Sequence, residues 1–310
     1  MEKKQYSVVI PVYNSEKTLG ELTERLIKVF HKLQSSFEII YVNDNSRDNS
    51  FGVLQELQQK YSGEQITVID LTRNYGQQNA IMCGFKYSNA EYIINMDDDL
   101  QNPPEEIPKL IAKIAEGYDA VWGNYSRKQD KSYKNLGSII FRKLNHKIFK
   151  TGKNLKFTSF RIFKNEIIQQ VITYKTTFPY ITGIVLTITS NVTNVEVEHL
   201  ERKQGRSNYT FKKLIKLSLN LLVNYSTIPL RLFGYIGLSV SFISMIIGTI
   251  YLLRQLLNGR APAGWTSLIV LVSFYNSLIL IIFFVLGEYI SRILKESGDI
   301  RAYSVREVIK

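Results

Sequence analysis

The sequence has very few of the residues that hold soft metals or form disulfides. Its 310 residues include one cysteine, Cys83, and three scattered histidines. A single cysteine excludes an internal disulfide framework and a cysteine-rich zinc site, and histidines this sparse do not predict a metal cluster. The N-terminus leads directly into a strand-like segment and lacks the roughly 7–15 apolar residues of a signal peptide. We therefore expect the bulk of the chain to stay in the cytoplasm.

Charge is absent from two long segments, although the chain carries a formal net charge of +12. Neither Leu232–Leu253 nor Ala261–Gly287 contains a charged residue. A helix of this length spans about 33 Å or more, against a hydrocarbon core of about 30 Å. The sequence therefore predicts two transmembrane helices, at about 232–253 and 264–287, as a hairpin within residues 231–290.

Basic residues flank this predicted hairpin on both sides. Because lysine and arginine are enriched in cytoplasmic segments, both outer ends are expected in the cytoplasm, with 291–310 as a cytoplasmic tail. Residues 209–230 mix lysines with apolar residues, which favours an amphipathic helix on the membrane surface, in contact with anionic lipids. The alternative is a solvated helix packed on its own domain. No zinc-finger or aromatic RNA-binding signature is present, so nucleic acid is not an expected partner.

Before residue 209 the chain alternates short apolar runs with helical patterns. Each run is typical of a buried parallel strand, and the spacing after it is typical of a helix. The four expected strand–helix pairs are 6–12 with 19–33, 37–42 with 48–61, 65–71 with 76–87, and 91–96 with a helix ending at 115. This alternation predicts an α/β fold with an open, mainly parallel sheet. From 123 to 206 the pattern loosens, and we expect a basic helix at 136–149 and strands near 157–163, 181–189 and 192–199.

Polar residues follow several of the predicted strands, where ligands of open α/β sheets bind. They are Asn14, Asp44, Arg73 and the triplet Asp97–Asp99. Three consecutive carboxylates repel one another unless a cation gathers them, and oxygen ligands favour Mg²⁺ or Mn²⁺. The alternative is an acidic loop that caps the following helix.

Several motifs together give this sequence a resemblance to a known family. It resembles the family 2 glycosyltransferases, in the branch that includes dolichol-phosphate mannose synthase and bacterial polyprenyl-phosphate glucosyltransferases. The nine-residue stretch DDDLQNPPE is the most specific motif. The segments that carry the resemblance are 9–14 (VIPVYN), 42–46 (VNDNS), 73–77 (RNYGQ), 97–105 (DDDLQNPPE), 160–161 (FR) and 202–207 (RKQGRS).

The resemblance implies a Rossmann-like fold of the GT-A type, which binds a nucleotide sugar within residues 1–208. Pro11, Val12 and Tyr13 would line the base and ribose. Val42 and Asp44 would complete that pocket, with Asp44 accepting a hydrogen bond from the base.

The resemblance also implies a metal site and a set of phosphate-binding residues. Asp97 would contact the ribose or the metal, and Asp99 with Gln101 would hold Mg²⁺ or Mn²⁺ against the diphosphate. Further contacts to the donor or to the lipid phosphate would come from Asp98, Arg127, Arg161, Arg202 and Ser207.

The activity implied is that of an inverting, metal-dependent hexosyltransferase. It would move one sugar from a nucleotide sugar, UDP-linked by preference, to polyprenyl (undecaprenyl) phosphate at the cytoplasmic face of the inner membrane. A flippase partner and a homo-oligomer are compatible with this reading. The alternatives are transfer to another lipid-linked or glycan acceptor, a processive polysaccharide synthase, and a non-catalytic membrane scaffold.

The sequence departs from the family pattern at a few motif positions. Ser15 stands where a glutamate is common, and VNDNS replaces VDDGS, so that Asn43 takes the place of an acid and Asn45 that of a glycine. Asn208 stands where many family members have a lysine, and Asn124 stands at about the position where many have an arginine.

Overall fold

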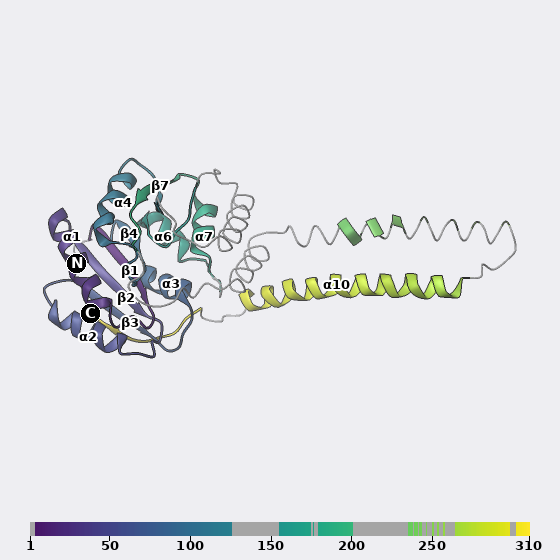
Figure 1. Ribbon diagram of the computed structural model, residues 1–310, viewed down its shortest axis with the longest axis horizontal. Coiled ribbons are helices and arrows are strands. Elements are labelled where there is room, and N and C mark those ends of the chain that lie inside the picture. Colours follow the sequence, from purple (N-terminus) through teal and green to yellow (C-terminus); the bar gives the residue numbers. More distant parts are fainter. Residues whose placement is uncertain are drawn as a thin grey trace. The chain divides into compact units, whose positions relative to one another are not determined.

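The structure is a computed structural model that describes most of the chain (Figure 1). The described residues are 4–125, 155–200 except 175, 177 and 178, isolated positions between 235 and 257, 264–297 and 302–310. The chain forms two compact units, one of residues 1–215 with 300–310 and the other of residues 216–299.

Among the described residues of the first unit, eight strands form one sheet in the order β7-β5-β6-β4-β1-β2-β3-β8. The pairs β1–β2, β1–β4, β2–β3 and β5–β7 are parallel, and β3–β8, β4–β6 and β5–β6 are antiparallel. The strands are β1 (Tyr6–Val12), β2 (Phe37–Asn43), β3 (Ile66–Leu71), β4 (Tyr92–Asn95), β5 (Ala120–Tyr125), β6 (Arg161–Lys164), β7 (Val192–Val197) and β8 (Val305–Ile309).

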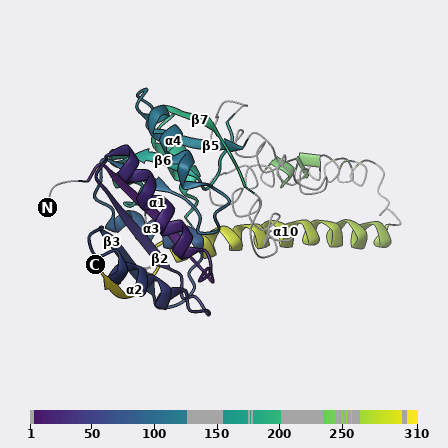
Figure 2. The ribbon, with the colours of Figure 1, turned by 60° about the vertical axis from the view of Figure 1, so that its left-hand side comes forward.

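Helices cover both faces of this sheet, which confirms the expected α/β class. One face is covered by α1 (Leu19–Leu33), α2 (Ser50–Lys60) and α4 (Ile107–Ile114), and these helices share a core with β1 and β2 (Figure 2). The short helix η1 (Pro104–Glu106) directly precedes α4. On the other face lie α3 (Gln77–Tyr87), α6 (Asn165–Val171) and α7 (Ile181–Ile188). Every residue of β1, β2 and β3 is buried, as their continuous apolar runs predict.

Helix α3 approaches the sheet closely at a glycine. A Cβ on Gly84 would lie 2.4 Å from Cγ1 of Val9, on the central strand. Because no real Cβ comes so near another carbon, glycine is what allows α3 to settle against β1. This contact places the first residues of α3 beside the carboxyl ends of the central strands.

The second half of the sheet differs from its sequence prediction. Residues 181–188 form α7, and the expected strand there is wrong, because a short β-branched apolar run fits a buried helix as well as a strand. The strand expected near 157–163 begins only at Arg161, whereas β7 confirms the one expected near 192–199. The predicted basic helix at 136–149 lies outside the described residues.

Residues 305–309 form a strand of the sheet, although the sequence predicts only a tail at 291–310. Strand β8 pairs antiparallel with β3, with Ile309 opposite Val68. The first unit is therefore made of two chain segments, one that precedes the second unit in the sequence and one that follows it.

In the second unit, α10 (Trp265–Ser297) is a helix of 33 residues. Its exposed large apolar side chains include Phe274, Phe283 and Phe284. Counting only residues that the structure describes, no helix is both long enough and apolar enough to cross a membrane. The surface helix at 209–230 and most of 232–253 lie outside those residues, so the membrane hairpin stays a prediction.

Candidate active site

The loops after β1, β2 and β4 turn sharply at the carboxyl ends of the strands. Asn14, Asn45 and Leu100 have positive φ angles of 56°, 54° and 59°. Asparagine enters this left-handed region more easily than most residues, so Asn45 can occupy a position where the family pattern has glycine. The first two loops are also joined, because Asn14 N donates to Ser46 Oγ at 3.0 Å and Arg47 N donates to Asn14 Oδ1 at 2.7 Å.

Asp44 is the acid that follows β2, and it holds the loop after β3. Its carboxylate accepts hydrogen bonds from the backbone N–H of Tyr75 at 2.7 Å and of Gly76 at 2.8 Å. Burial raises the pKa of Asp44, and these two bonds act against that rise. Each carboxylate oxygen keeps a second lone pair, so the arrangement is compatible with the predicted bond from a nucleotide base.

The asparagine before Asp44 has a structural explanation. Asn43 Nδ2 donates to Asp70 Oδ1 at 2.6 Å, and Asn43 Oδ1 accepts from Ser46. An aspartate at position 43 would place a second carboxylate against buried Asp70, and like charges at this distance destabilise a site. The amide therefore suits this chain better than the acid of the family pattern.

The predicted base-lining residues differ in their exposure. Val12 and Val42 are fully buried and Pro11 is buried, so their side chains belong to the core and their role in a pocket would be through the backbone. Tyr13 is 42% exposed, and its backbone N donates to Asp98 Oδ2 at 3.2 Å.

Asp98 is engaged by the loop after β1. Besides the bond from Tyr13, its Oδ2 accepts from Ser15 Oγ at 2.5 Å, and its carbonyl oxygen accepts from Thr18 Oγ1 at 2.7 Å. Burial raises the pKa of Asp98 to about 7, with smaller contributions from the charges of the two flanking aspartates. A glutamate at position 15 would bring a further carboxylate to this acid, and like charges repel one another.

Asp97 is held from two distant parts of the chain. Gln77 Nε2, at the start of α3, donates to its Oδ1 at 2.7 Å, and Ser159 Oγ donates to its Oδ2. Neither residue is among the predicted site residues. Gln77 lies in the RNYGQ motif and could have been singled out there, whereas nothing in the sequence marks Ser159.

Asp97, Asp99 and Gln101 offer the oxygen atoms that a hard divalent ion prefers. Asp99 Oδ1 accepts from Gln101 N at 3.2 Å, so these two residues form one tight turn. Two carboxylates and an amide oxygen within five residues fit Mg²⁺ or Mn²⁺ and leave room for phosphate oxygens. Among the described residues no three His, Cys, Asp or Glu side chains form a metal-binding group.

His199 is an exposed residue that lies beside Gln101, one of the predicted metal ligands. Its ring stacks on Tyr125 with centroids 4.0 Å apart, and its Nε2 is 3.5 Å from Gln101 Nε2. The backbone N of Leu200 donates to the carbonyl of Gln101 at 2.9 Å, which fixes the end of β7 to the DDDLQNPPE segment. Only the fold brings residues 101 and 199 together.

Arg161, which the resemblance implies as a phosphate contact, is enclosed in the sheet. The residue is 3% exposed, and its guanidinium donates to Asn95 Oδ1 at 3.0 Å and to Thr182 Oγ1 at 2.9 Å. Burial lowers its pKa to about 10, and the charge of Asp97 acts against this shift. Its hydrogen-bond partners within the described residues are neutral.

The other predicted phosphate-binding residues lie outside the described residues. They are Arg127, Arg202 and Ser207.

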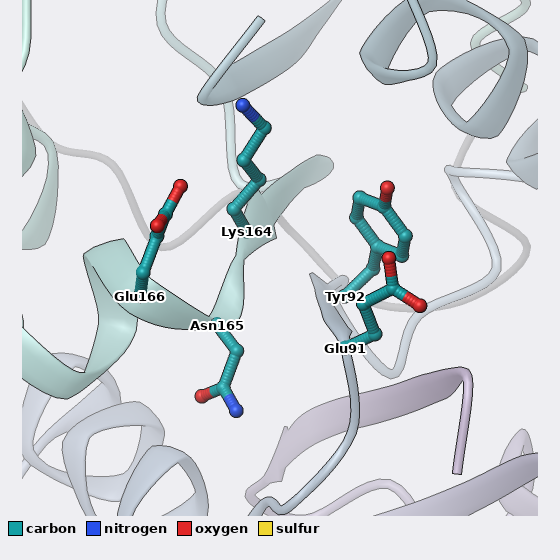
Figure 3. Close-up of a pocket in the computed structure, with 5 residues that line it drawn as sticks. All are labelled: Glu91, Tyr92, Lys164, Asn165 and Glu166. Atoms are coloured by element: carbon teal, nitrogen blue, oxygen red, sulfur yellow. The ribbon is translucent and has the colours of Figure 1, made fainter. Parts of the chain in front are cut away.

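A separate cleft lies at the other end of β4. It has a volume of about 310 Å³ and is lined by Glu91, Tyr92, Lys164, Asn165 and Glu166 (Figure 3). Tyr92 begins β4 and Asp97 follows its end, so this cleft and the aspartates are at opposite ends of the strand. None of the predicted site residues lines it.

A known protein family matches more than half of the chain. The model of the family described as "Glycosyl transferase family 2" matches residues 7–172, which include the Asp44 loop and the DDDLQNPPE segment. The chain belongs to glycosyl transferase family 2. As a family 2 glycosyltransferase it is an enzyme that transfers a sugar.

Curated relatives match this glycosyltransferase over nearly its whole length. The undecaprenyl-phosphate 4-deoxy-4-formamido-L-arabinose transferase of Proteus mirabilis is 35% identical, covering 98% of this chain and 93% of the relative. The corresponding transferase of Shewanella sediminis is 33% identical over 98% and 92%. An uncharacterized glycosyltransferase of Bacillus subtilis, YkcC, is 33% identical over 98% and 94%.

Solved structures support the fold of this glycosyltransferase. Mannosyl-3-phosphoglycerate synthase from Rubrobacter xylanophilus has a TM-score of 0.53 at 15% identity, with 75% of each chain covered. Glucosyl-3-phosphoglycerate synthase from Mycobacterium tuberculosis, solved with Mn²⁺, UDP and glucosyl-3-phosphoglycerate, has a TM-score of 0.51 at 16% identity, covering 71% of this chain and 78% of that one. These likenesses confirm the GT-A type α/β fold.

Proposed function

We propose that this glycosyltransferase moves one sugar from a nucleotide sugar to undecaprenyl phosphate at the cytoplasmic face of the membrane. The observation that carries the proposal is the placement of two polar sets on either side of β1. The Asp44 loop follows β2, and Asp97, Asp99 and Gln101 follow β4, while β1 lies between these strands. Neighbouring strands are about 4.8 Å apart, so the sets lie about 10 Å apart, a spacing that suits a base at one and a diphosphate at the other.

The donor side would bind the nucleotide through Asp44 and Tyr13. Asp44 is already oriented by two backbone N–H groups, and Tyr13 is the exposed side chain of the base-lining set. UDP is our preferred nucleotide, because it is the one bound in the mycobacterial synthase of the same fold.

The leaving diphosphate requires positive charge as its bond to the sugar breaks. A bound divalent ion supplies this charge, and Asp99 and Gln101 would hold it. Gln77 and Ser159 fix the orientation of Asp97, so that the carboxylate needs little rearrangement when the donor binds. Direct displacement by the acceptor would invert the configuration at the anomeric carbon.

The acceptor side is proposed from the chemistry of a lipid phosphate. Such a phosphate is already anionic at neutral pH, so the reaction needs no general base. Relatives that match 98% of this chain are named for transfer involving undecaprenyl phosphate. The charge-free segments at 232–253 and 264–287 would place the enzyme at the membrane, with Arg127, Arg202 and Ser207 near the lipid phosphate.

The experiment that tests this function measures release of nucleoside diphosphate by the purified full chain in detergent. Undecaprenyl phosphate, Mg²⁺ or Mn²⁺ and a panel of UDP- and GDP-sugars, including the formamido-arabinose donor, would be supplied. We expect release from one donor that depends on both the lipid and the metal ion. Release that ignores the lipid would assign a different acceptor, and no release from any donor would favour a non-catalytic role.

A further inference from the structure

Strand β8 carries an arginine that reaches the loops of the donor site. Arg306 Nη1 contacts Asp70 Oδ2 at 2.7 Å, while the Asp70 side chain is only 2% exposed. Its Nη2 donates to the carbonyl oxygen of Thr72 at 3.1 Å and approaches Asn45 Oδ1 at 3.4 Å. One guanidinium therefore contacts the ends of both β2 and β3.

The residues that Arg306 contacts surround Asp44. Asp70 also accepts from Asn43, so its two carboxylate oxygens link β8 to the residue before Asp44. Asn45 is the residue after Asp44, and Thr72 begins the loop whose Tyr75 and Gly76 amides bind the Asp44 carboxylate. The conformation of this loop and the direction of Asp44 are thus connected to β8.

Two further contacts fasten the segment before Arg306. Thr72 N donates to the carbonyl of Ser304 at 3.0 Å. The hydroxyl of Tyr303 is hydrogen-bonded to the buried thiol of Cys83 in α3. With these contacts the segment lies against β3, its following loop and α3.

We propose that Arg306 is a positioning residue for the nucleotide-binding loops, so that β8 forms part of the donor site. An exposed ion pair contributes little to stability, but Asp70 is buried and would be left without its cation if Arg306 were removed. The turn at Asn45 and the loop that begins at Thr72 would then both lose their contact with the guanidinium. The kinetic consequence rests on the proposed function, because it needs a nucleotide-sugar donor.

The first test compares Arg306→Ala, Arg306→Lys and the control Glu307→Gln in the transfer assay. We expect Arg306→Ala to raise the donor KM about tenfold, which is about 1.4 kcal/mol of binding, with the lipid KM and kcat within about twofold of wild type, because the donor loops lose the contacts to Asp70 and Thr72. Lysine keeps the positive charge at Asp70 but lacks the planar guanidinium, so the donor KM of Arg306→Lys should lie between those of the wild type and Arg306→Ala. Glu307 is exposed on the same strand, and Glu307→Gln should behave as wild type.

The second test does not depend on turnover. Hydrogen exchange of peptides covering Thr72–Gln77 should be faster in Arg306→Ala, with exchange in β1 unchanged. Unchanged exchange together with an unchanged donor KM would overturn the positioning role. An inactive wild type would instead count against the proposed function, and the exchange result would still decide whether Arg306 holds the loop. If Arg306→Ala does not fold, Arg306→Lys carries both measurements.

Discussion

The two halves of the sheet are built in different ways. In the half formed by β1, β2 and β3, parallel strands come from consecutive strand–helix repeats, and the site residues follow the strands directly. In the half formed by β4, β6, β5 and β7, β6 runs antiparallel between two strands that precede it in the chain. There Asp97 is held by Ser159, 62 residues away. On the nucleotide side the motif residues come from consecutive repeats, and β8 adds support from a distant segment. On the metal side a direct partner of Asp97 itself comes from a distant segment.

The largest effect is expected at the metal side. Asp99→Ala should reduce transfer about 10³-fold or more, because charge stabilisation by a bound ion contributes several kcal/mol and each 1.36 kcal/mol is about tenfold in rate. Initial rates with saturating donor would measure it, and circular dichroism would check the fold. Glu105→Gln, in the same motif but bonded to Arg25 on α1, should keep the wild-type rate within about twofold. Full activity in Asp99→Ala would exclude this residue from the ion site.

Substitution of the buried Arg161 tests whether this residue acts in the stability of the metal side of the sheet or in the chemistry. Arg161→Met should lower the free energy of unfolding by about 3 kcal/mol, because the oxygens of Asn95 and Thr182 lose a charged donor. Thermal melting in detergent would report it, against Arg25→Met, whose surface ion pairs with Glu21 and Glu105 contribute about 1 kcal/mol. A wild-type melting temperature combined with lost transfer would place Arg161 in the chemistry instead.

The nucleotide side should show a smaller change, confined to donor binding. In Asp44→Asn the amide oxygen can accept from Tyr75 or Gly76 but not from both, so one N–H loses its acceptor at a cost of about 1.5–3 kcal/mol and the other keeps only a neutral acceptor. We expect the donor KM to rise about 10- to 100-fold with the lipid KM unchanged. Titration with nucleoside diphosphate in the presence of Mn²⁺ would measure the binding directly. A change in the lipid KM alone would contradict the assignment of Asp44 to the donor.

The smallest effect is expected where the two halves meet. Ser15→Ala removes one hydrogen bond to Asp98 and leaves the bond from Tyr13 N in place. A loss of about 1 kcal/mol is typical of one hydrogen bond, which corresponds to a fall in melting temperature of about 2–4 °C at this size. The melting temperature of Ser15→Glu should be lower still, because the substitution adds a carboxylate beside Asp98. Equal melting temperatures for the two variants would contradict the charge argument.

The same division explains what the sequence could predict. Continuous apolar runs with helical spacing between them predicted β1, β2 and β3, and motif residues such as Asp44 and Asp99 lie at strand ends as expected. Where a segment is short, as at 181–188, strand and helix patterns coincide and packing against α6 decides the outcome. The roles of Ser159 and His199 depend on contacts between distant residues, which no local pattern records. The strand at 305–309 was missed for the same reason.

Strand β8 also sets an order of events during synthesis. The ribosome makes residues 216–299 before it makes β8, yet β8 completes the sheet that began near Tyr6. Until then the outer edge of β3 has no partner on that side, and an unpaired edge is a template for association with other chains. The eight-stranded sheet can therefore be completed only after the two charge-free segments have been synthesised.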